Sequence, residues 1–380
     1  SSPQSGSGER GPGVQLRLAA ELVADGGRAA SGPDFFRSAE FLEAEGTTHS
    51  LLIFEDGDET ELVASTPLIV REIPGSDRLD AISPYGYPGL AISDGPLLRL
   101  DFPLDPEAID FTGTGLVTIF LRHSLEAPSG EVPHVSDRDG AERAAPLEER
   151  DPLAAGPPLA GATPRNVCLL SDPALPRKSR ASDRQQIRKN LKRGCSLEIT
   201  PGPETTPEER AGFFTAYTET MARTEAADRY FFSEKYFDRI LSAEGTWLFL
   251  LRAPEEEADA DGRRPVAAAS IAALSDGLLH YYLSGTADAH LRGAPMKNVV
   301  EEMIGFAAER ELALNFGGGI TPGDALEEFK RGFANTEQQW FTSEIVCDGT
   351  AYETLTARLA PNADSDFFPR YRSQSRPNHP

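Results

Sequence analysis

The amino-acid sequence predicts a mixed α/β protein with two folded units, and two observations lead to this class. In the second half, apolar residues recur at helical spacing and then in short runs bounded by turn residues, which is typical of helices mixed with strands. Between the halves, residues 125–165 are rich in Pro, Ala, Gly and charge, as expected of a linker or long surface excursion. A chain of 380 residues with 39% apolar content can fill two cores of ordinary size.

The second half has the clearer order of elements: two helices, three strands, then helix, strand, helix and strand. The helix after the three strands is strongly amphipathic, with Met296, Val300 and Met303 on one side. This order resembles the GNAT acyltransferase fold, which is built around a mixed sheet. The predicted helices cover 207–223, 233–241 and 295–310, with a short one from Asp324, and the predicted strands cover 246–252, 265–274, 278–284, 312–316 and 340–347.

The first half is predicted to be another mixed α/β unit, although no sequence repeat links the two halves. Its predicted elements are a helix over 33–45 and strands over 50–55, 61–73 and 116–122. The predicted division is a flexible leader over 1–13, an N-terminal GNAT-like domain over 14–124, the linker over 125–165, a C-terminal GNAT-like domain over 166–350 and a C-terminal tail over 351–380. The part of the tail after about residue 362 is polar and rich in Pro, and it is expected to be loosely held.

Charge and cysteine content exclude several classes of protein. The net charge of −23 repels polyanions at long range, so we expect no DNA binding and no general affinity for nucleic acid. Cys168, Cys195 and Cys347 are far apart and lack CxxC spacing, so structural thiols are expected rather than a disulfide scaffold or metal site. No apolar run approaches the ~20 residues that span a bilayer, and the N-terminus does not resemble a signal peptide. We therefore expect a cytoplasmic protein without a bound metal.

The segment from Asp324 to Phe333 is the strongest candidate for chemistry. Asp324 is expected to cap a short helix, with Glu327 completing a box-like cap three residues later. Phe329 and Phe333 fall on one helix face, and Lys330 projects beside them. Such a cation can stabilise an oxyanion in acyl transfer. The alternative is an ordinary surface lysine on an amphipathic helix.

Two further segments carry aromatic and basic side chains that can line a substrate cleft. Tyr85 and Tyr87 lie in a turn with glycines that permit a sharp bend, as a wall for a small substrate or as a purely structural turn. Arg122 and His123 close a predicted strand, where Arg122 can hold an anion and His123 can hold an anion or act as a base. A structural role for His123 remains the alternative.

Tyr281 and Tyr282 are neighbours on a predicted strand. Because successive side chains of a strand point to opposite faces, at most one of these two is expected to face the ligand cleft.

A basic segment over 177–193 stands out in this acidic chain, with eight Lys or Arg residues and one acid. Its helical part pairs Ile187 with Leu191 as the expected buried face. Arg184 and Arg188 belong to a row at i, i+4 and i+8. Like charges in a row destabilise a helix unless anions balance them, so phosphate binding is one interpretation and a solvated surface is the other.

Four of these segments together resemble the FemABX family of non-ribosomal peptidyl transferases. The matching segments are Ser83-Pro-Tyr-Gly-Tyr87, the basic stretch 187–194, the strand 279–284 and Phe329-Lys-Arg-Gly-Phe333. The resemblance implies two GNAT-like domains and transfer of an aminoacyl group from aminoacyl-tRNA, with no separate cofactor. It also implies that Lys330 steadies the charge of the transition state beside Phe329, that Tyr281 or Tyr282 and Glu344 lie near that site, and that Arg188 and Lys189 face a phosphate.

The sequence also departs from the family pattern. The long coiled-coil arm of some members is absent, the turn continues as Pro88-Gly89-Leu90, and His123 is followed by Ser124. These departures lie on the acceptor side, so a small amine such as a specialised-metabolite (antibiotic) intermediate is expected alongside a cell-wall precursor.

The donor has two candidates. The phosphate-gripping loop of acetyl-CoA enzymes is reduced here to residues 290–295, ending in a proline without an N–H. This favours aminoacyl-tRNA, with acyl-CoA as the alternative donor. A non-catalytic protein that binds a phosphorylated ligand is the second alternative.

Overall fold

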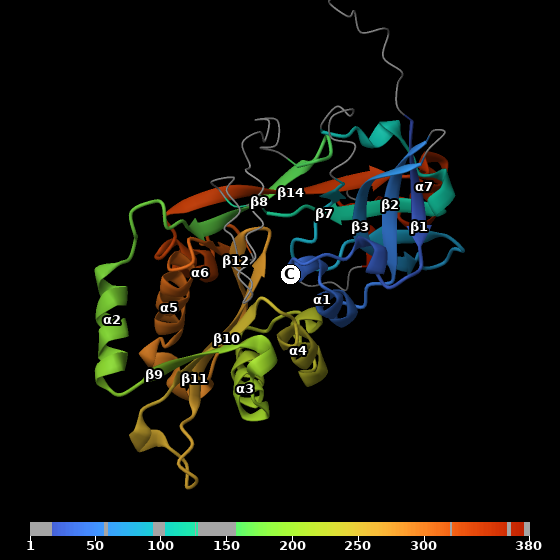
Figure 1. Ribbon diagram of the computed structural model, residues 1–380. Helices are drawn as coiled ribbons and strands as arrows, with labels where there is room; N and C mark the ends of the chain where they lie inside the picture. The colour runs from blue at the N-terminus through green and yellow to red at the C-terminus, as the bar shows by residue number, and fades with distance from the viewer. Residues whose placement is uncertain are drawn as a thin grey trace, which may run out of the picture.

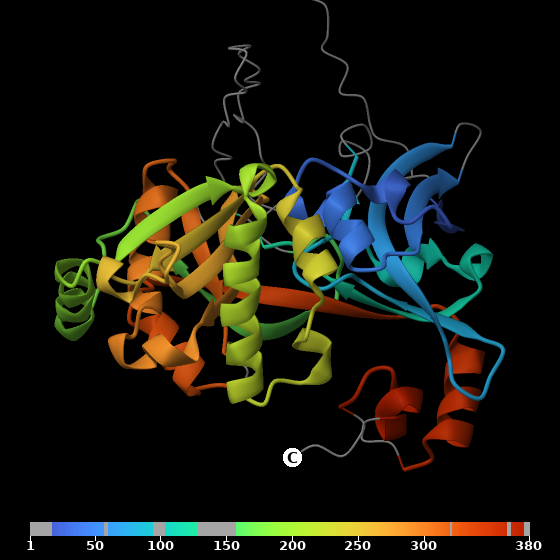
Figure 2. The ribbon, with the colours of Figure 1, turned by 90° about the horizontal axis from the view of Figure 1, so that it is seen from below.

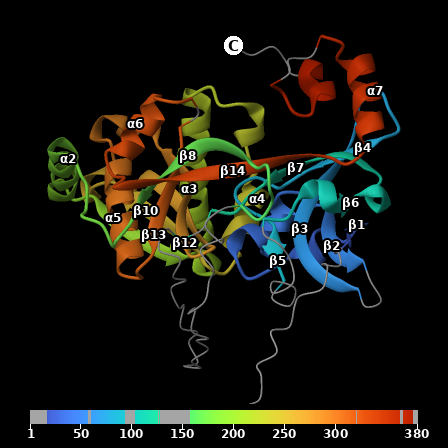
Figure 3. The same ribbon diagram turned by 90° about the horizontal axis from the view of Figure 1, so that it is seen from above.

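The computed structural model describes residues 17–56, 60–93, 103–125, 127, 157–319, 321–362 and 366–375. Within these ranges the two halves share one continuous sheet, seen along its length in Figures 1 and 3, in the order β6-β1-β2-β3-β4-β7-β14-β8-β13-β12-β11-β10-β9, with β5 paired to β3. The mixed α/β class is confirmed. The predicted leader over 1–13 and most of the predicted linker lie outside the described residues.

The N-terminal half contributes the first seven strands. The strands are β1 (Arg17–Val23), β2 (His49–Asp56), β3 (Glu61–Glu72), β4 (Leu79–Ile82), β5 (Ala91–Ile92), β6 (Ile109–Asp110) and β7 (Leu116–Arg122). The predicted helix over 33–45 is instead a 3-10 turn (Phe35–Arg37) and α1 (Ala39–Ala44). Ser38 interrupts it because its backbone is extended and its side chain accepts a hydrogen bond from the Phe41 N–H, so that Ser38 caps α1.

The second half follows the predicted order closely. Its helices are α2 (Ala181–Lys192), α3 (Pro207–Arg223), α4 (Glu234–Leu241), α5 (Met296–Ala308) and α6 (Ala325–Arg331), and its strands are β8 (Thr163–Ser171), β9 (Ser196–Pro201), β10 (Thr246–Arg252), β11 (Val266–Ser275), β12 (Leu278–Thr286), β13 (Ala313–Gly317) and β14 (Thr336–Val346). The predicted linker ends too late, because β8 begins at Thr163.

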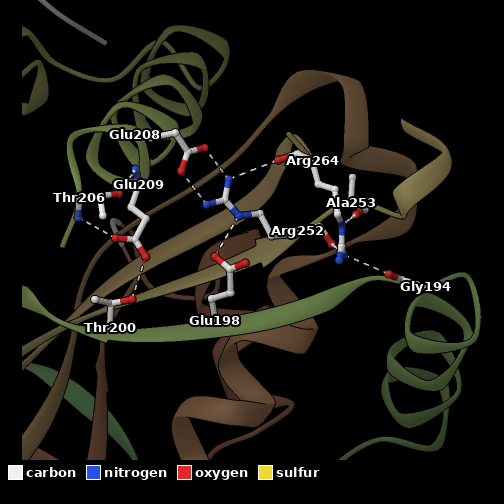
Figure 4. Close-up of polar contacts among 9 residues, drawn as sticks. All are labelled: Gly194, Glu198, Thr200, Thr206, Glu208, Glu209, Arg252, Ala253 and Arg264. Atoms are coloured by element: carbon white, nitrogen blue, oxygen red, sulfur yellow. Dashed lines mark hydrogen bonds and ion pairs between the residues drawn. The ribbon is translucent and has the colours of Figure 1, made fainter. Parts of the chain in front are cut away.

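α3 begins at a well-defined cap and is tied to the sheet by a buried arginine. Thr206 and Glu209 form a capping box at its start. Arg252 on β10 donates to both oxygens of Glu208 on α3, at 2.7 and 2.9 Å, and to Glu198 on β9 at 3.0 Å (Figure 4). The bonds to Glu208 raise the pKa of Arg252 above its usual range. This network fixes the helix against the outer edge of the sheet.

β14 joins the two halves. Its first part pairs with β8, from Thr336 to Thr342, and its last part pairs with β7, from Thr342 to Val346 (Figures 1 and 2). The predicted strand over 340–347 therefore starts four residues too late. The domain division at 14–124 and 166–350 stays a prediction, with the addition that a strand of the second segment completes the sheet of the first.

The prediction of a loosely held tail after about residue 362 is wrong for the described part of that segment, residues 366–375. Helix α7 (Gly349–Leu359) and the 3-10 helix η11 (Arg370–Ser375) pack below the N-terminal half (Figure 2). Tyr352, Leu355 and Tyr371 are buried in one cluster with Ile73 and Val117. Tyr371 and Arg372 also bond to Asp80, a fully buried carboxylate on β4.

Candidate functional site

Lys330 lies in the last turn of α6, and the fold buries it. Asp324 caps the helix, with its Oδ1 accepting from the Glu327 N–H at 2.8 Å. Glu327 reaches back to the Gly323 N–H rather than to the cap residue itself, so the predicted box is displaced by one residue. Lys330 is 7% exposed, and its Nζ donates to the Gly318 carbonyl at 2.6 Å. Burial lowers the pKa of Lys330 to about 8, so the ammonium is poised near neutral pH.

Gly317 lies close to both Lys330 and Tyr87. Gly317, at the end of β13, has φ +70°, and a Cβ built on it would lie 3.7 Å from the Tyr87 hydroxyl and 3.8 Å from the Lys330 Nζ. Apart from Gly317 itself and its chain neighbours Phe316 and Gly318, no other atom of the described residues comes within 4 Å of that point. The Tyr87 hydroxyl and the Lys330 ammonium thus lie near the same stretch of backbone, where both can donate to one atom of a substrate.

Cys168 completes this group as a buried free thiol, in keeping with the structural role predicted from the sequence. Its Sγ lies 3.5 Å from the Tyr87 hydroxyl, and the side chain is 3% exposed. Burial raises the pKa of the Cys168 thiol, although Tyr87 and Lys330 oppose that shift. The thiol is therefore neutral and serves as a contact for Tyr87 rather than as a nucleophile.

A buried relay holds the Gly317 turn in place. The His280 Nε2 donates to the Ser275 carbonyl at 3.2 Å, and its Nδ1 accepts from the Asn315 amide at 3.1 Å. The Asn315 Oδ1 in turn accepts from the Gly317 N–H at 2.8 Å. Burial lowers the pKa of His280 to about 4, so the ring stays neutral and keeps this tautomer.

Arg122 and Tyr85 form a second cluster, next to Tyr87. The Arg122 guanidinium lies over the Tyr85 ring at 5.1 Å and over the Trp340 ring at 5.4 Å. Within the described part of the chain, no carboxylate lies within ion-pair distance of it. Burial lowers the pKa of Arg122, while the neighbouring tyrosines oppose that shift. A partly buried cation without a bonded acid is suited to an anionic group of a substrate.

Glu45 and Tyr236, which sequence reasoning missed, border this cluster. The Glu45 carboxylate accepts from the Tyr236 hydroxyl at 2.6 Å and from the Tyr85 N–H at 3.3 Å. Burial raises the pKa of Glu45, and Arg122 acts in the opposite direction. The Tyr282 hydroxyl lies 2.9 Å from that of Tyr236 and so joins the same wall. No local motif marks Glu45, because α1 reaches this cluster only through the tertiary fold.

The two neighbouring tyrosines of β12 lie on opposite faces, as the strand geometry requires. Tyr282 packs with Phe35 and Phe36 of the N-terminal half. Tyr281 lies on the other face, where its hydroxyl accepts from the Ser284 Oγ at 2.5 Å and its ring contacts Phe316. The pKa values of both tyrosines are raised by burial, that of Tyr281 to about 12.

Two predicted site residues lie elsewhere. His123 is 1% exposed, and its Nε2 contacts the Ser343 Oγ at 2.7 Å. Burial lowers its pKa to about 4, so the ring stays neutral. The His123 carbonyl accepts from the Trp340 indole and thereby positions that ring under Arg122. Glu344 pairs with Arg165 at 2.7 Å. It lies six residues along β14 from Gln338, which pairs with Cys168, so roughly 20 Å of strand separates Glu344 from the position beside Cys168.

The remaining predicted residues are not brought to Lys330. Phe329 packs on the core of the second half and contacts the Phe333 ring at a centroid distance of 5.5 Å. Arg184, Arg188 and Lys189 are exposed on α2. The expected Ile187–Leu191 buried pair is wrong, since Leu191 is 52% exposed and the buried residues of α2 are Asp183, Ile187 and Asn190.

Comparison with known proteins agrees with this architecture. Residues 177–331 match the family model described as an acetyltransferase (GNAT) domain. The crystal structure of FemX superposes with a TM-score of 0.54 at 12% identity, covering 88% of this chain and 99% of that chain. The chain has the FemX fold. The FemX-like double-GNAT arrangement expected from the sequence is therefore confirmed, and its mixed sheets are joined through β14.

Other solved structures are similar at lower scores. The C-terminal domain of a putative lysylphosphatidylglycerol synthetase from Agrobacterium fabrum has a TM-score of 0.48 at 14% identity, over 84% of this chain and 89% of that chain. A tandem GNAT protein from the clavulanic acid biosynthesis pathway has a TM-score of 0.38 at 13% identity, over 87% and 99%. No curated protein sequence matches.

The structure also bears on membranes and metals. Among the described residues, no helix is both long and apolar enough to cross a membrane. Within the same ranges, no three His, Cys, Asp or Glu side chains gather as a metal site would require.

Proposed function

We propose that this protein forms an amide bond by moving an aminoacyl group from aminoacyl-tRNA to an amine acceptor in the cytoplasm. One observation carries the proposal: in a FemX-like fold, the Tyr87 hydroxyl and the buried Lys330 ammonium both lie beside the Gly317 backbone. Two donors around one point suit the oxygen of a tetrahedral intermediate, whose negative charge develops during the reaction.

The chemistry requires no nucleophile from the protein. The neutral amine attacks the ester carbonyl, so that a C–N bond forms while the carbonyl oxygen gains charge beside Lys330. The C–O bond to the terminal ribose then breaks, and the proton lost by the amine leaves with that oxygen. Tyr87 donates to the same oxyanion.

The Arg122 cluster is the proposed acceptor side. Arg122 can bind a carboxylate or phosphate of the acceptor, with Tyr85 and Tyr282 lining the path. A small amine of specialised metabolism and a cell-wall precursor both carry such groups. Glu45, next to Arg122, can bind the positively charged form of the amine before it loses its proton.

The donor test uses total tRNA charged with labelled amino acids and a panel of amines, followed by mass spectrometry of the products. We expect amide products that disappear when the charged tRNA is treated with RNase before mixing. Acyl-CoA substrates should give no product. Transfer from acyl-CoA that RNase leaves intact would contradict the tRNA donor while preserving acyl transfer. Tight binding of a phosphorylated ligand with no transfer from any donor would favour the non-catalytic alternative.

The acyl-CoA alternative has a specific observation in its favour. A cavity of about 240 Å³ lies at the start of α5 and is lined by Arg193, His290 and Arg292, among others. However, the N–H groups of the second and third residues of α5 are already used. Those of Lys297 and Asn298 donate to the carbonyls of Ala294 and Pro295. Backbone donors for a pyrophosphate are therefore scarce, which keeps acyl-CoA in second place.

The surroundings of Gly317 can be tested with Gly317→Ala. The added methyl group would lie at ordinary contact distances from Tyr87 and Lys330, so we expect kcat to fall on the order of 10²-fold, the scale of a lost oxyanion donor. Gly115→Ala is the matched control, because Gly115 has φ +68° and open space around it. Both variants carry the same backbone strain of about 1 kcal/mol. Equal kcat values for Gly317→Ala and Gly115→Ala would show that the surroundings of Gly317 do not take part in the reaction.

A further inference from the structure

We infer that the exposed face of α2 is the docking surface for the acceptor stem of the donor tRNA, recognised through its phosphate backbone. The inference rests on the proposed function and names where its macromolecular substrate is held. The basic face is defined here as Arg184, Arg188, Lys189 and Lys192, all of them exposed.

The basic face contains no acid. The one acidic residue of α2, Asp183, is buried on the opposite side and pairs with Lys297 of α5 at 2.8 Å. Asn190 on the same buried side donates to Asn298 at 2.7 Å. α2 is therefore anchored to α5 by its polar stripe, and the basic face is left to solvent.

Nearby carboxylates form ion pairs with the arginines that flank the basic face, rather than with the basic face itself. Arg177, Arg180 and Arg193 pair with Glu301, Glu328 and Glu257. In the described part of the chain, the four residues of the basic face have no acid within ion-pair distance. Arg184 bonds to Ser179, and the Arg188 Nε donates to the Arg184 carbonyl.

This pattern costs stability in the free protein. Like charges at i, i+4 destabilise a helix by about 0.2–0.5 kcal/mol per pair. In a chain with net charge −23, a row of unpaired cations is a local exception. Binding to the phosphates of a nucleic acid would offset this destabilisation of the helix, because each contact releases condensed counterions from the nucleic acid.

The position of α2 suits delivery to Lys330. α2 stands on the outside of α5, at the edge of the molecule (Figure 1). Its N-terminal end contacts α6, since Arg180 bonds to Glu328 and lies against Gly332, two residues beyond Lys330. A duplex lying along this helix, about 18 Å long at 1.5 Å per residue, ends beside the helix that carries Lys330. The unpaired 3′ end then needs to continue only around α6.

The test is fluorescence anisotropy of the full chain with a labelled acceptor-stem minihelix, measured over a range of salt concentrations. The variant is Arg188→Gln/Lys189→Gln/Lys192→Gln. The control is Arg28→Gln/Lys235→Gln/Arg358→Gln, which removes the same charge from exposed positions on other elements. We expect the α2 variant to bind on the order of 10–100-fold more weakly and to lower the slope of log K against log salt by about three, one for each lost contact. The control should bind nearly as the wild type does.

Transfer assays separate this inference from the proposed function. With intact charged tRNA, the α2 variant should lose activity, whereas with a short aminoacylated CCA trinucleotide it should keep the wild-type rate. Minihelix binding unchanged in the α2 variant, or absent in the wild type, would overturn the docking surface whatever the transfer assays show. Binding to anionic vesicles in place of the minihelix would overturn it too. If no charged tRNA serves as a donor but minihelix binding still depends on α2, the proposed transfer reaction would be contradicted and the docking surface would stand.

Discussion

Lys330→Met is expected to lower kcat by on the order of 10²–10³ and at the same time to stabilise the protein. The loss is the scale of removing one oxyanion donor from a preorganised site. The gain arises because burial lowers the pKa of Lys330 to about 8 from an ordinary value of 10.5, so the folded state carries a disfavoured charge at neutral pH. At about 1.4 kcal/mol per pKa unit, removing that charge is worth about 3 kcal/mol.

The pH dependence of this gain has a definite sign. Below pH 8 the lysine is charged in both folded and unfolded states, so the wild type bears the full cost. As pH rises from about 8 to about 10.5, the folded state releases its proton first, and the cost disappears. Urea denaturation of wild type and variant should therefore give a difference in the free energy of unfolding that shrinks over this window. A constant difference would show that the lysine does not titrate as the geometry implies.

The catalytic role of the charge can be measured in the same window. If the ammonium stabilises the oxyanion, kcat of the wild type should fall above pH 8, where Lys330 loses its proton. In Lys330→Arg, which stays protonated, that fall should be absent. An increase in kcat above pH 8 would mean that the neutral lysine acts as a base, and full activity in Lys330→Met would remove Lys330 from the mechanism.

Asp80→Ala is expected to reduce the free energy of unfolding by about 3–5 kcal/mol, because it leaves cations without their buried partner. Asp80 is fully buried and accepts from the Arg71 Nε at 2.9 Å, from the Arg372 Nε at 2.6 Å and from the Tyr371 hydroxyl at 3.0 Å. The variant should also free the segment around Tyr371, which limited proteolysis can detect.

The matched control is Asp348→Ala, which breaks an ion pair of similar length, 2.7 Å to Arg78, but with both side chains more than one-third exposed. Exposed pairs contribute about 0–1 kcal/mol, although Asp348 also caps α7, which adds about 1 kcal/mol. A smaller loss for Asp80 than for Asp348 would mean that the C-terminal segment is not held through β4.

The sequence predicted the second half well because its signals are local. Periodicity located α3, β10 and α5 within two residues, and Asp324 marked the start of α6. The burial of Lys330 could not be read from its helix, because the atoms around it come from Tyr87, Cys168 and Gly317 in three other elements. Helical spacing shows which side chains share a face but not what covers that face.

The errors have the same origin. The start of β8 reads as linker because Pro164 and Arg165 lack strand character, yet both pair or bond with β14. The C-terminal residues read as polar and loose, whereas Tyr371 inserts beside Asp80 from nearly 300 positions away. Leu191 was assigned to a core, but α2 is held by Asp183 and Asn190, a polar contact that an apolar pattern does not predict.

Because β14 pairs with β7, the sheet of the N-terminal half cannot be completed during synthesis until the C-terminal part of the chain has been translated. When residue 125 leaves the ribosome, the edge of β7 has no partner, and Asp80 lacks Tyr371 and Arg372. About 250 further residues must be translated first, which takes roughly 10–50 s at 5–20 residues per second. During that interval the nascent N-terminal half presents an open sheet edge, the kind of surface that chaperones bind and that promotes aggregation.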